Sequence, residues 1–386
     1  MRKALIALAA AGLMTSVTLT ACDSGSDDGD TGGDKGSEIT STATSSGKGR
    51  NGVGVILPDS ESSARWATDD PKALNAAFAK ANVPHEIQNA EGNTEAFKGI
   101  AKAMLDSGVK VLMIVNLDSE SGKAVIDLAR SRKVPVIDYD RLTLNGNADY
   151  YVSFNNETVG KQQAEGLVKC LQDKGIEKPV IAELNGSPTD NNATLFKRGY
   201  DSILQPKYDN GDYVKGPDQS VPQWDNTEGG KIFTQMVEQW PDIDGVLAAN
   251  DGLGNAAIEV LRDRKRNGAK AKGVPVTGQD ATVQGLQNIL LGDQCVTVFK
   301  SATEEADQAA KLAISLVTGK KPAADGKIVK DPETGRYVPS VLLTPKSVTA
   351  KNMMATVVES GAVRYEDLCT DKYKAACDKY KITPKK

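Results

Sequence analysis

A carboxylate and two amides stand in a row at Asp190, Asn191 and Asn192. They follow an apolar run at 180–184 that predicts a buried strand, and they precede a segment at 193–200 with apolar residues at helical spacing. Open α/β sheets bind their ligands at the carboxyl ends of strands. Because carboxylates accept hydrogen bonds and amides both donate and accept them, this set suits a neutral, hydroxyl-rich ligand better than an anion. The alternative is that these residues only cap the helix, with Asp190 or Asn191 as its N-cap.

Polar residues also follow four other predicted strands, at Asp138–Arg141, Asn250–Asp251, Gly278–Asp280 and Lys300. A single Asp after a strand is usually a turn former or a helix cap. Five polar strand ends, all on the carboxyl-terminal rim of a sheet, are harder to explain as caps alone. We therefore expect these side chains to converge on one cleft between two domains.

The elements that position these residues alternate between apolar strand-like runs and amphipathic helical windows. Such alternation predicts parallel sheets covered by helices on both faces, and its restart after 151–154 predicts two successive α/β domains. The expected strands are 52–57, 109–115, 134–138, 151–154, 180–184, 245–248, 274–278 and 295–299, and the expected helices include 72–81 and 303–318.

Length and composition fit a two-domain globular protein. The chain has 386 residues, and its formal net charge of −4 gives no indication of a nucleic-acid surface, so we expect no nucleic-acid partner. His85, the single histidine, lies at a predicted strand start away from the polar strand ends, which favours a structural role over that of a general base. The sequence has no zinc spacing, calcium loop, phosphate-binding loop or Ser-His-Asp set. We expect neither a metal nor a cofactor.

The N-terminus carries a secretion signal. Arg2 and Lys3 precede an apolar core at 4–13 that is too short for a permanent membrane helix. Residues 19–22 then resemble the bacterial lipobox, so we expect a signal peptide at 1–21 and a lipid on Cys22; a plain secretory signal is the alternative. The polar segment 22–50 cannot bury a core and is expected to be a disordered tether with a reach of about 30 Å. The protein is therefore expected outside the cytoplasm, anchored to the outer face of the cell membrane.

Four of the five cysteines remain after Cys22. An extracytoplasmic location favours two disulfides, for which three connectivities are possible. Cys369 and Cys377 are close in sequence and are expected to pair and clasp the C-terminal tail, which leaves Cys170 and Cys295 to pair across the fold. Buried free thiols are the alternative.

Several motifs resemble those of the sugar-binding proteins of bacterial ABC importers, the type I periplasmic-binding-protein family. They occur in the family's order over about 52–352, and the motifs at 138–141 and 186–193 are most similar to the D-xylose-binding branch. The resemblance implies an α/β fold of two doubly wound parallel-sheet domains that are joined by a three-crossing hinge and close on a sugar. The matching motifs are Asp138–Arg141, Ser153–Gly160, Gly186–Ala193, Asn250–Asp251, Gly278–Asp280, Thr297–Lys300 and Leu342–Pro345.

The resemblance also implies the domain limits. The hinge crossings would fall near 153–155, 300–303 and 342–345. The N-terminal sugar-binding domain would then comprise 51–153 and 302–342, and the C-terminal one 154–301 and 343–365, followed by a tail at 366–386 to which we assign no function.

The same resemblance implies a set of sugar contacts. Asp140 and Arg141 would bind vicinal hydroxyls, and Trp224 would pack on the apolar face of a pyranose. The full set is Arg65, Trp66, Asp140, Arg141, Asp190, Asn192, Trp224, Asn250, Asp280 and Lys300. Two positions depart from the family: Ser220 stands where a second tryptophan is frequent, and Gly252 where a side chain is more usual.

The implied function is that of a non-enzymatic, monomeric receptor that delivers a monosaccharide, most closely D-xylose, to an ABC permease and its ATPase. The two departures leave glucose or another sugar as an alternative cargo. The same fold would also serve a sensor that presents sugar to a membrane kinase, or a receptor for a furanone-type signal. A glycoside-active enzyme with two acidic residues as its acid/base pair is the alternative of a different class.

Overall fold

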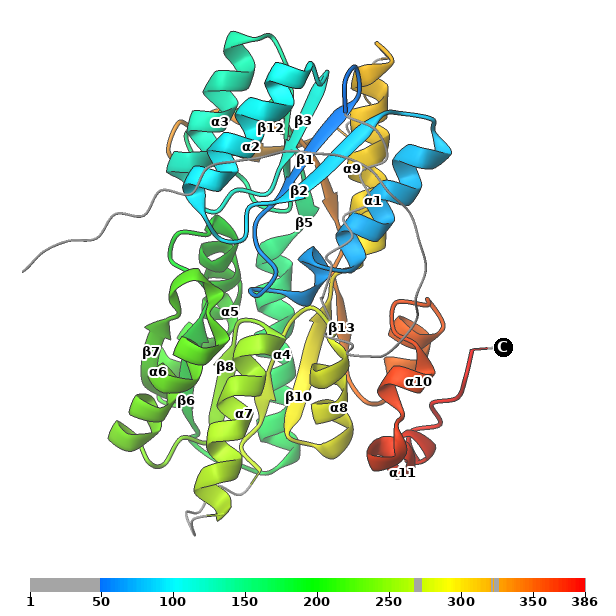
Figure 1. Cartoon of the computed structure of the whole chain (residues 1–386). Helices are drawn as coiled ribbons and strands as arrows, with labels where there is room; N and C mark the ends of the chain where they lie inside the picture. The colour runs from blue at the N-terminus through cyan, green and yellow to red at the C-terminus, as the bar shows by residue number, and fades with distance from the viewer. Residues whose placement is uncertain (1–48, 267–272, 321, 323–325, 386) are drawn as a thin grey trace, which may run out of the picture. The chain divides into compact units, whose positions relative to one another are not determined.

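The computed structural model describes residues 49–385 except for 267–272, 321 and 323–325 (Figure 1). The expected signal peptide, Cys22 and nearly all of the tether lie outside the described residues. The described chain contains two β-sheets. None of its described helices is long and apolar enough to span a membrane.

The first sheet is covered by helices on both faces. Its strands are β1 (Val53–Leu57), β2 (His85–Asn89), β3 (Val111–Ile114), β4 (Val136–Tyr139), β5 (Tyr150–Phe154), β11 (Lys327–Lys330) and β12 (Tyr337–Leu343), in the order β11-β12-β5-β4-β3-β1-β2. Only β11 pairs in antiparallel fashion, with β12. Val111 and Met113 of β3 pack with helices α1 (Asp69–Lys80) and α9 (Ala302–Val317). Leu112 and Ile114 pack on the opposite face, with α2 (Thr94–Ser107) and α3 (Ser119–Ser131).

The second sheet repeats the same plan. Its strands are β6 (Val180–Asn185), β7 (Val214–Ser220), β8 (Gly245–Ala248), β9 (Val276–Thr277), β10 (Gln294–Phe299) and β13 (Lys346–Val348), in the order β13-β10-β9-β8-β6-β7. Its helices are α4 (Asn156–Asp173), α5 (Asn191–Asp209), α6 (Asn226–Gln239), α7 (Asp251–Arg266) and α8 (Val283–Leu291). All strands run parallel except β13, which is antiparallel to β10. Buried side chains of α4 to α7 form one apolar core with the strands.

Three segments pass from one sheet to the other. β5 of the first sheet leads into α4, β10 of the second leads into α9, and β12 of the first leads into β13. The connecting residues, 155, 300–301 and 344–345, fall where the hinge crossings were predicted. The structure therefore confirms the predicted fold class: two doubly wound α/β lobes joined by three crossings.

The end of the chain packs on the second lobe. A π-helical turn (Met354–Val358), α10 (Tyr365–Leu368) and α11 (Asp371–Lys379) share an apolar cluster with Leu286 and Ile289 of α8. The side chain of Gln287 donates hydrogen bonds to the carbonyls of Asp367 and Leu368. Residues 366–382 of the expected tail thus contribute to the core beside α8.

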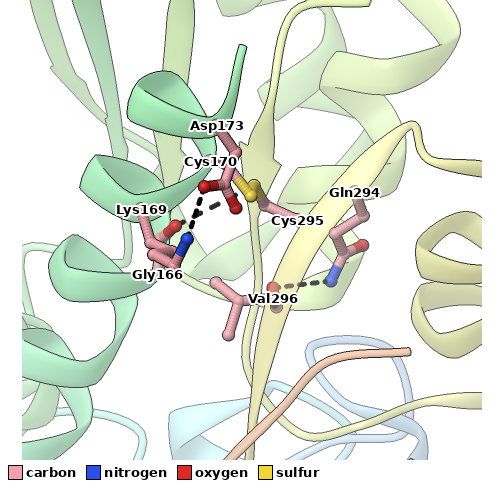
Figure 2. Close-up of a disulfide and its surroundings, with 7 residues drawn as sticks. All are labelled: Gly166, Lys169, Cys170, Asp173, Gln294, Cys295 and Val296. Carbon is pink, nitrogen blue, oxygen red and sulfur yellow. Dashed lines mark hydrogen bonds and ion pairs between the residues drawn. A yellow bond between two sulfur atoms is a disulfide. The ribbon is translucent and has the colours of Figure 1, made fainter. Parts of the chain in front are cut away.

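Two cysteine pairs are joined in the structure. Cys170 of α4 bonds to Cys295 of β10 with a Cα–Cα distance of 6.3 Å, beside the ion pair of Lys169 with Asp173 (Figure 2). Cys369 bonds to Cys377 with a Cα–Cα distance of 6.0 Å, which links the end of α10 to α11. This connectivity is one of the three that four cysteines allow.

Candidate functional site

The carboxyl-terminal rims of the two sheets enclose one polar cavity. Its volume is about 30 Å³, room for only a few water molecules, so the lobes lie close together around it. All ten candidate residues line it: Arg65, Trp66, Asp140, Arg141, Asp190, Asn192, Trp224, Asn250, Asp280 and Lys300. The structure therefore brings together residues as far apart in the chain as Arg65 and Lys300.

Each of these side chains follows a strand, as the sequence pattern predicts for all of them except Arg65, Trp66 and Trp224, which the family resemblance implied. In the first lobe, Arg65 and Trp66 lie in a 3₁₀ turn after β1, and Asp140 and Arg141 follow β4. In the second lobe the lining residues follow β6, β7, β8, β9 and β10 in turn; they are Asp190 and Asn192, Trp224, Asn250, Asp280 and Lys300. Parallel strands deliver them to one rim because their carboxyl ends point the same way.

Three of the lining residues have a left-handed backbone. The φ angles are 62° at Asp140, 59° at Trp224 and 95° at Asp280. Such conformations of non-glycine residues cost about 1–3 kcal/mol each and persist only where neighbouring structure enforces them. The backbone N–H of Asp140 donates to Val152, and that of Asp280 donates to Val298, so the adjacent strands fix both turns.

Asp190 both caps a helix and faces the cavity. One carboxylate oxygen accepts the backbone N–H of Asn192, which makes Asp190 the N-cap of α5. The other oxygen accepts the indole N–H of Trp224 at 3.1 Å and lies 3.1 Å from Nε of Arg141 in the opposite lobe. The capping explanation is therefore correct but incomplete, because a cap alone does not need the second oxygen.

Further polar contacts join the two lobes across the cavity. Nδ2 of Asn192 donates to the carbonyl and to Oδ1 of Asp140, at 3.0 and 3.1 Å. Ser63 donates to Oδ2 of Asp280 at 3.2 Å. Donors of each lobe thus form direct hydrogen bonds with acceptors of the other lobe.

The charge states of Asp140 and Lys300 are set by oppositely charged neighbours in the cavity. Burial alone would raise the pKa of Asp140, but Lys300, Arg65 and Arg141 outweigh it and hold that pKa below its usual range. Burial alone would lower the pKa of Lys300, but Asp140 and Asp280, at 3.6 and 3.8 Å from Nζ, raise it. Asp140 is therefore an ionised acceptor and Lys300 a charged donor at neutral pH.

Aromatic rings complete the cavity wall. The guanidinium of Arg65 lies over the Trp66 ring at 4.3 Å, and the Trp224 ring lies edge-on to Phe196 at 6.3 Å. A Cβ on Gly186 would come within 2.0 Å of the Trp224 ring, so only glycine lets that ring occupy its place. Flat rings match the apolar faces of a pyranose ring, and the charged groups beside them match its hydroxyls.

Known proteins with similar sequences show the family of this chain. A family model described as a periplasmic binding protein domain matches residues 53–321. The D-xylose-binding periplasmic protein of Escherichia coli (strain K12) is 34% identical over 286 residues, covering 73% of this chain and 82% of that protein. The chain belongs to the type I sugar-binding periplasmic proteins of ABC importers. That family consists of non-enzymatic transport receptors, so the glycosidase alternative is wrong.

Other proteins similar to this sugar-binding protein are described with ligands other than D-xylose. A multiple sugar-binding periplasmic protein of Azospirillum brasilense is 33% identical, covering 80% of this chain and 88% of that protein. The crystal structure of a solute binding protein from Clostridium phytofermentans with bound β-D-glucose has a TM-score of 0.75 and 26% identity, covering 82% of this chain and 99% of that one.

Four lining residues of this sugar-binding protein were not among the candidates: Ser62, Ser63, Phe196 and Gln279. Phe196 was attributed to the apolar face of α5, and Gln279 stands between two residues of a matching motif. For Phe196 and Gln279, the only sign of a place in the site was that candidate residues lie nearby in the sequence. Ser62 and Ser63 precede Arg65 in a loop without a periodic pattern.

The two departures from the family pattern have different outcomes. Ser220 ends β7 and does not line the cavity. A Cβ on Gly252 would lie 2.4 Å from Oδ1 of Asn226, so Asn226 fills the space where a side chain is more usual. His85 bonds to Asn75 and to the carbonyl of Val83, away from the cavity. The described residues contain no group that could hold a metal ion.

One buried carboxyl near the site predicts a pH effect on stability. Burial raises the pKa of Asp138 to about 7, although two hydrogen bonds from Thr143 oppose the shift. Because the folded pKa is above the unfolded one, the stabilisation is complete below pH of about 4 and is lost as pH rises through 7. Urea unfolding of the wild type and Asp138→Asn at pH 5 and pH 8 tests this. We expect the wild type's advantage over the variant to shrink by about 3 kcal/mol between these pH values; a pH-independent difference would contradict it.

Proposed function

We propose that the protein captures a monosaccharide in pyranose form by closure of its two lobes and delivers it to an ABC permease and its ATPase. D-Xylose is the first candidate for this monosaccharide. The observation that carries the proposal is a cavity in which charged donors, charged acceptors and two tryptophans from both lobes meet. The relative from Escherichia coli, named for D-xylose, supports this cargo.

Each lining group has a role in this proposal. The carboxylates of Asp140, Asp190 and Asp280 accept hydrogen bonds from sugar hydroxyls, since ionised carboxylates have acceptor sites only. Trp66 and Trp224 pack on the ring faces. The donors to hydroxyl oxygens are Arg65, Arg141, Asn192, Asn250 and Lys300.

Two buried polar atoms of lining residues support a polar ligand. Nε1 of Trp66 and Oε1 of Gln279 have no hydrogen-bond partner within the described part of the chain. Unsatisfied buried groups are few in folded proteins and call for an explanation. Sugar hydroxyls, which donate and accept, match one such donor and one such acceptor.

D-Glucose is the second candidate cargo. The solved structures with D-glucose, among them one from Chloroflexus aurantiacus with 28% identity and a TM-score of 0.73, favour it. Glucose has the hydroxyl pattern of xylose with one added group, so selection between them depends on the space beyond the ring. Sites that pair every hydroxyl reject its loss more strongly than they reject an addition.

Titration calorimetry against xylose, glucose, ribose, arabinose and galactose tests the proposal. We expect micromolar or tighter binding of xylose and weaker binding of ribose and arabinose, whose hydroxyls are differently placed. Tighter binding of glucose than of xylose would change the cargo and keep the receptor. Binding of none of the five sugars would contradict the proposal.

We further propose that Cys22 carries a lipid after removal of residues 1–21, and that 22–50 tethers a monomeric body to the cell membrane. The lobes would comprise 51–153 with 302–342, and 154–301 with 343–365. Both cysteine pairs, Cys170–Cys295 and Cys369–Cys377, would form in the oxidising extracytoplasmic space.

The anchor is tested in a bacterial host by fractionation. We expect the wild type in the membrane fraction and Cys22→Ser in the soluble extracytoplasmic fraction, because the lipid is the proposed anchor and none of the described helices could span a membrane. The two proteins should bind xylose equally, which controls for folding. A soluble wild type would contradict lipid anchoring and leave the sugar site untouched.

A further inference from the structure

Arg65 forms hydrogen bonds with two carboxyls that do not line the cavity. Its Nε donates to Oδ2 of Asp70 and its Nη2 to Oδ1, both at 2.7 Å, in a bidentate fork. Nη2 also donates to Oε2 of Glu305 at 2.6 Å. Asp70 and Glu305 are both 0% exposed. They form a layer beneath the cavity wall.

These contacts use most of the hydrogen-bonding capacity of Arg65. A guanidinium has five N–H donors. The N–H on Nε and the two on Nη2 are directed to Asp70 and Glu305, and one on Nη1 donates to Asp140 at 3.2 Å. One N–H on Nη1, beside the cavity-lining Asp140, remains for a ligand.

The layer is itself fixed by its neighbours. Asp70 lies in the first turn of α1 and accepts the hydroxyl of Tyr139. Glu305 lies in the first turn of α9, directly after a hinge crossing. The guanidinium stacks on Trp66. Arg65 therefore contacts two helices and the neighbouring ring of its own 3₁₀ turn before any ligand reaches it.

Glu305 faces several charged and titratable groups. Burial raises its pKa to about 8, although Arg65 opposes the shift, so it is largely protonated at neutral pH. Its Oε1 has no partner within the described residues. The groups that face it are Arg65, Asp70, Asp140 and Lys300, together with Tyr139 and Tyr151.

We propose that Asp70 and Glu305 are positioning residues, which fix Arg65 so that a single Nη1 N–H meets a sugar hydroxyl. The inference rests on the proposed function, since it assigns roles within the same site. A free arginine side chain loses rotamer entropy when a ligand immobilises it, so prior fixation favours binding. Carboxyls behind a ligand-contacting group also set its orientation.

The test compares two buried Glu→Gln variants of the full chain by xylose calorimetry. At about pH 9, where Glu305 is ionised, we expect Glu305→Gln to weaken xylose binding about tenfold, the value of one charge-assisted hydrogen bond to Arg65. The matched control is Glu183→Gln, because Glu183 is also 0% exposed and pairs with Lys197 at 2.6 Å, but lies in β6 away from Arg65. The control should bind xylose like the wild type. Equal affinity in wild type and Glu305→Gln, or an equal loss in the control, would overturn the inference.

Two further readouts separate positioning from folding. In an Arg65→Met background, Glu305→Gln should cause no additional loss of affinity, because it acts through Arg65; additive losses would overturn the inference. In the wild type, xylose affinity should rise as pH rises through about 8, because ionised Glu305 holds the guanidinium more firmly in place, and Glu305→Gln should abolish this step. The same step in the variant would also count against it.

Failure of the inference and failure of the proposed function give different results. A wild type that binds xylose as tightly as Glu305→Gln would overturn the positioning role alone. A wild type that binds no sugar would overturn the proposed function, and the positioning role with it.

Discussion

Asp190→Ala is expected to weaken xylose binding at least about 100-fold. The substitution removes the acceptor of the Trp224 indole and the partner of Arg141, which is 7% exposed. Removal of one partner from a buried ion pair costs about 3–5 kcal/mol, which is a factor of more than 100 in affinity if it falls on the bound state. Titration calorimetry of the variant measures the loss directly.

A second capping aspartate provides the control for this variant. Asp118 is the N-cap of α3 and accepts the N–H of Ser121, as Asp190 accepts that of Asn192. Each substitution by alanine should lower the free energy of unfolding by about 1 kcal/mol through loss of the cap, and Asp190→Ala should lower it further through loss of the pair with Arg141. Asp118→Ala should retain xylose binding. Equal affinities of the two variants would mean that Asp190 serves only as a cap.

Gly160→Ala is expected to destabilise the protein by about 3 kcal/mol, at the upper end for overpacked positions. A Cβ at Gly160 of α4 would lie 2.0 Å from the carbonyl oxygen of Phe196 in α5, which is backbone and cannot rotate away. The two helices must therefore separate. Asn156 of α4 donates to Oδ1 of Asn192 at 2.8 Å, so separation also displaces a cavity residue and should weaken sugar binding.

The opposite result is expected for a glycine with free space around it. A Cβ on Gly99 of α2 would meet nothing within 4 Å. Gly99→Ala should therefore stabilise the protein by up to about 1 kcal/mol, because alanine restricts the unfolded chain and favours helix. Thermal unfolding of both variants measures the contrast. A Gly160→Ala protein as stable as the wild type would show that the helix contact is looser than described.

The central strands and the site could be predicted from sequence because both follow local rules. Buried parallel strands are continuous apolar runs, such as Gly245–Ala248, which the sequence predicts with the same limits as β8. Parallel strands direct their carboxyl ends to one rim, so Asp140, Asp190 and Asp280 could be expected in one cleft. Their assignment to sugar hydroxyls came from the family resemblance and stays a prediction.

The edges of the sheets could not be predicted, because exposure removes the apolar pattern. β7 has the sequence Val-Lys-Gly-Pro-Asp-Gln-Ser at 214–220, without hydrophobic alternation, and it forms the edge of the second sheet. β11 at the edge of the first sheet is likewise mostly exposed. Such strands are specified by the neighbour on which they pair, which is a tertiary contact.

The layer of carboxyl groups behind Arg65 could not be predicted from the sequence either. Asp70 precedes an ordinary helical pattern and Glu305 lies in a helix whose apolar positions are regular, so neither has a local sign of its role. Their convergence depends on the return of α9 to the first lobe after the hinge crossing. Only the three-dimensional fold brings residues 70 and 305 to the same guanidinium.

A crystal structure of the protein with D-xylose tests the central claim most directly. We predict one pyranose in the cavity between Trp66 and Trp224, with its hydroxyls within about 3 Å of the carboxylates of Asp140 and Asp190 and of Nη1 of Arg65. A sugar bound elsewhere on the molecule, or in the cavity without contact to these groups, would contradict the account.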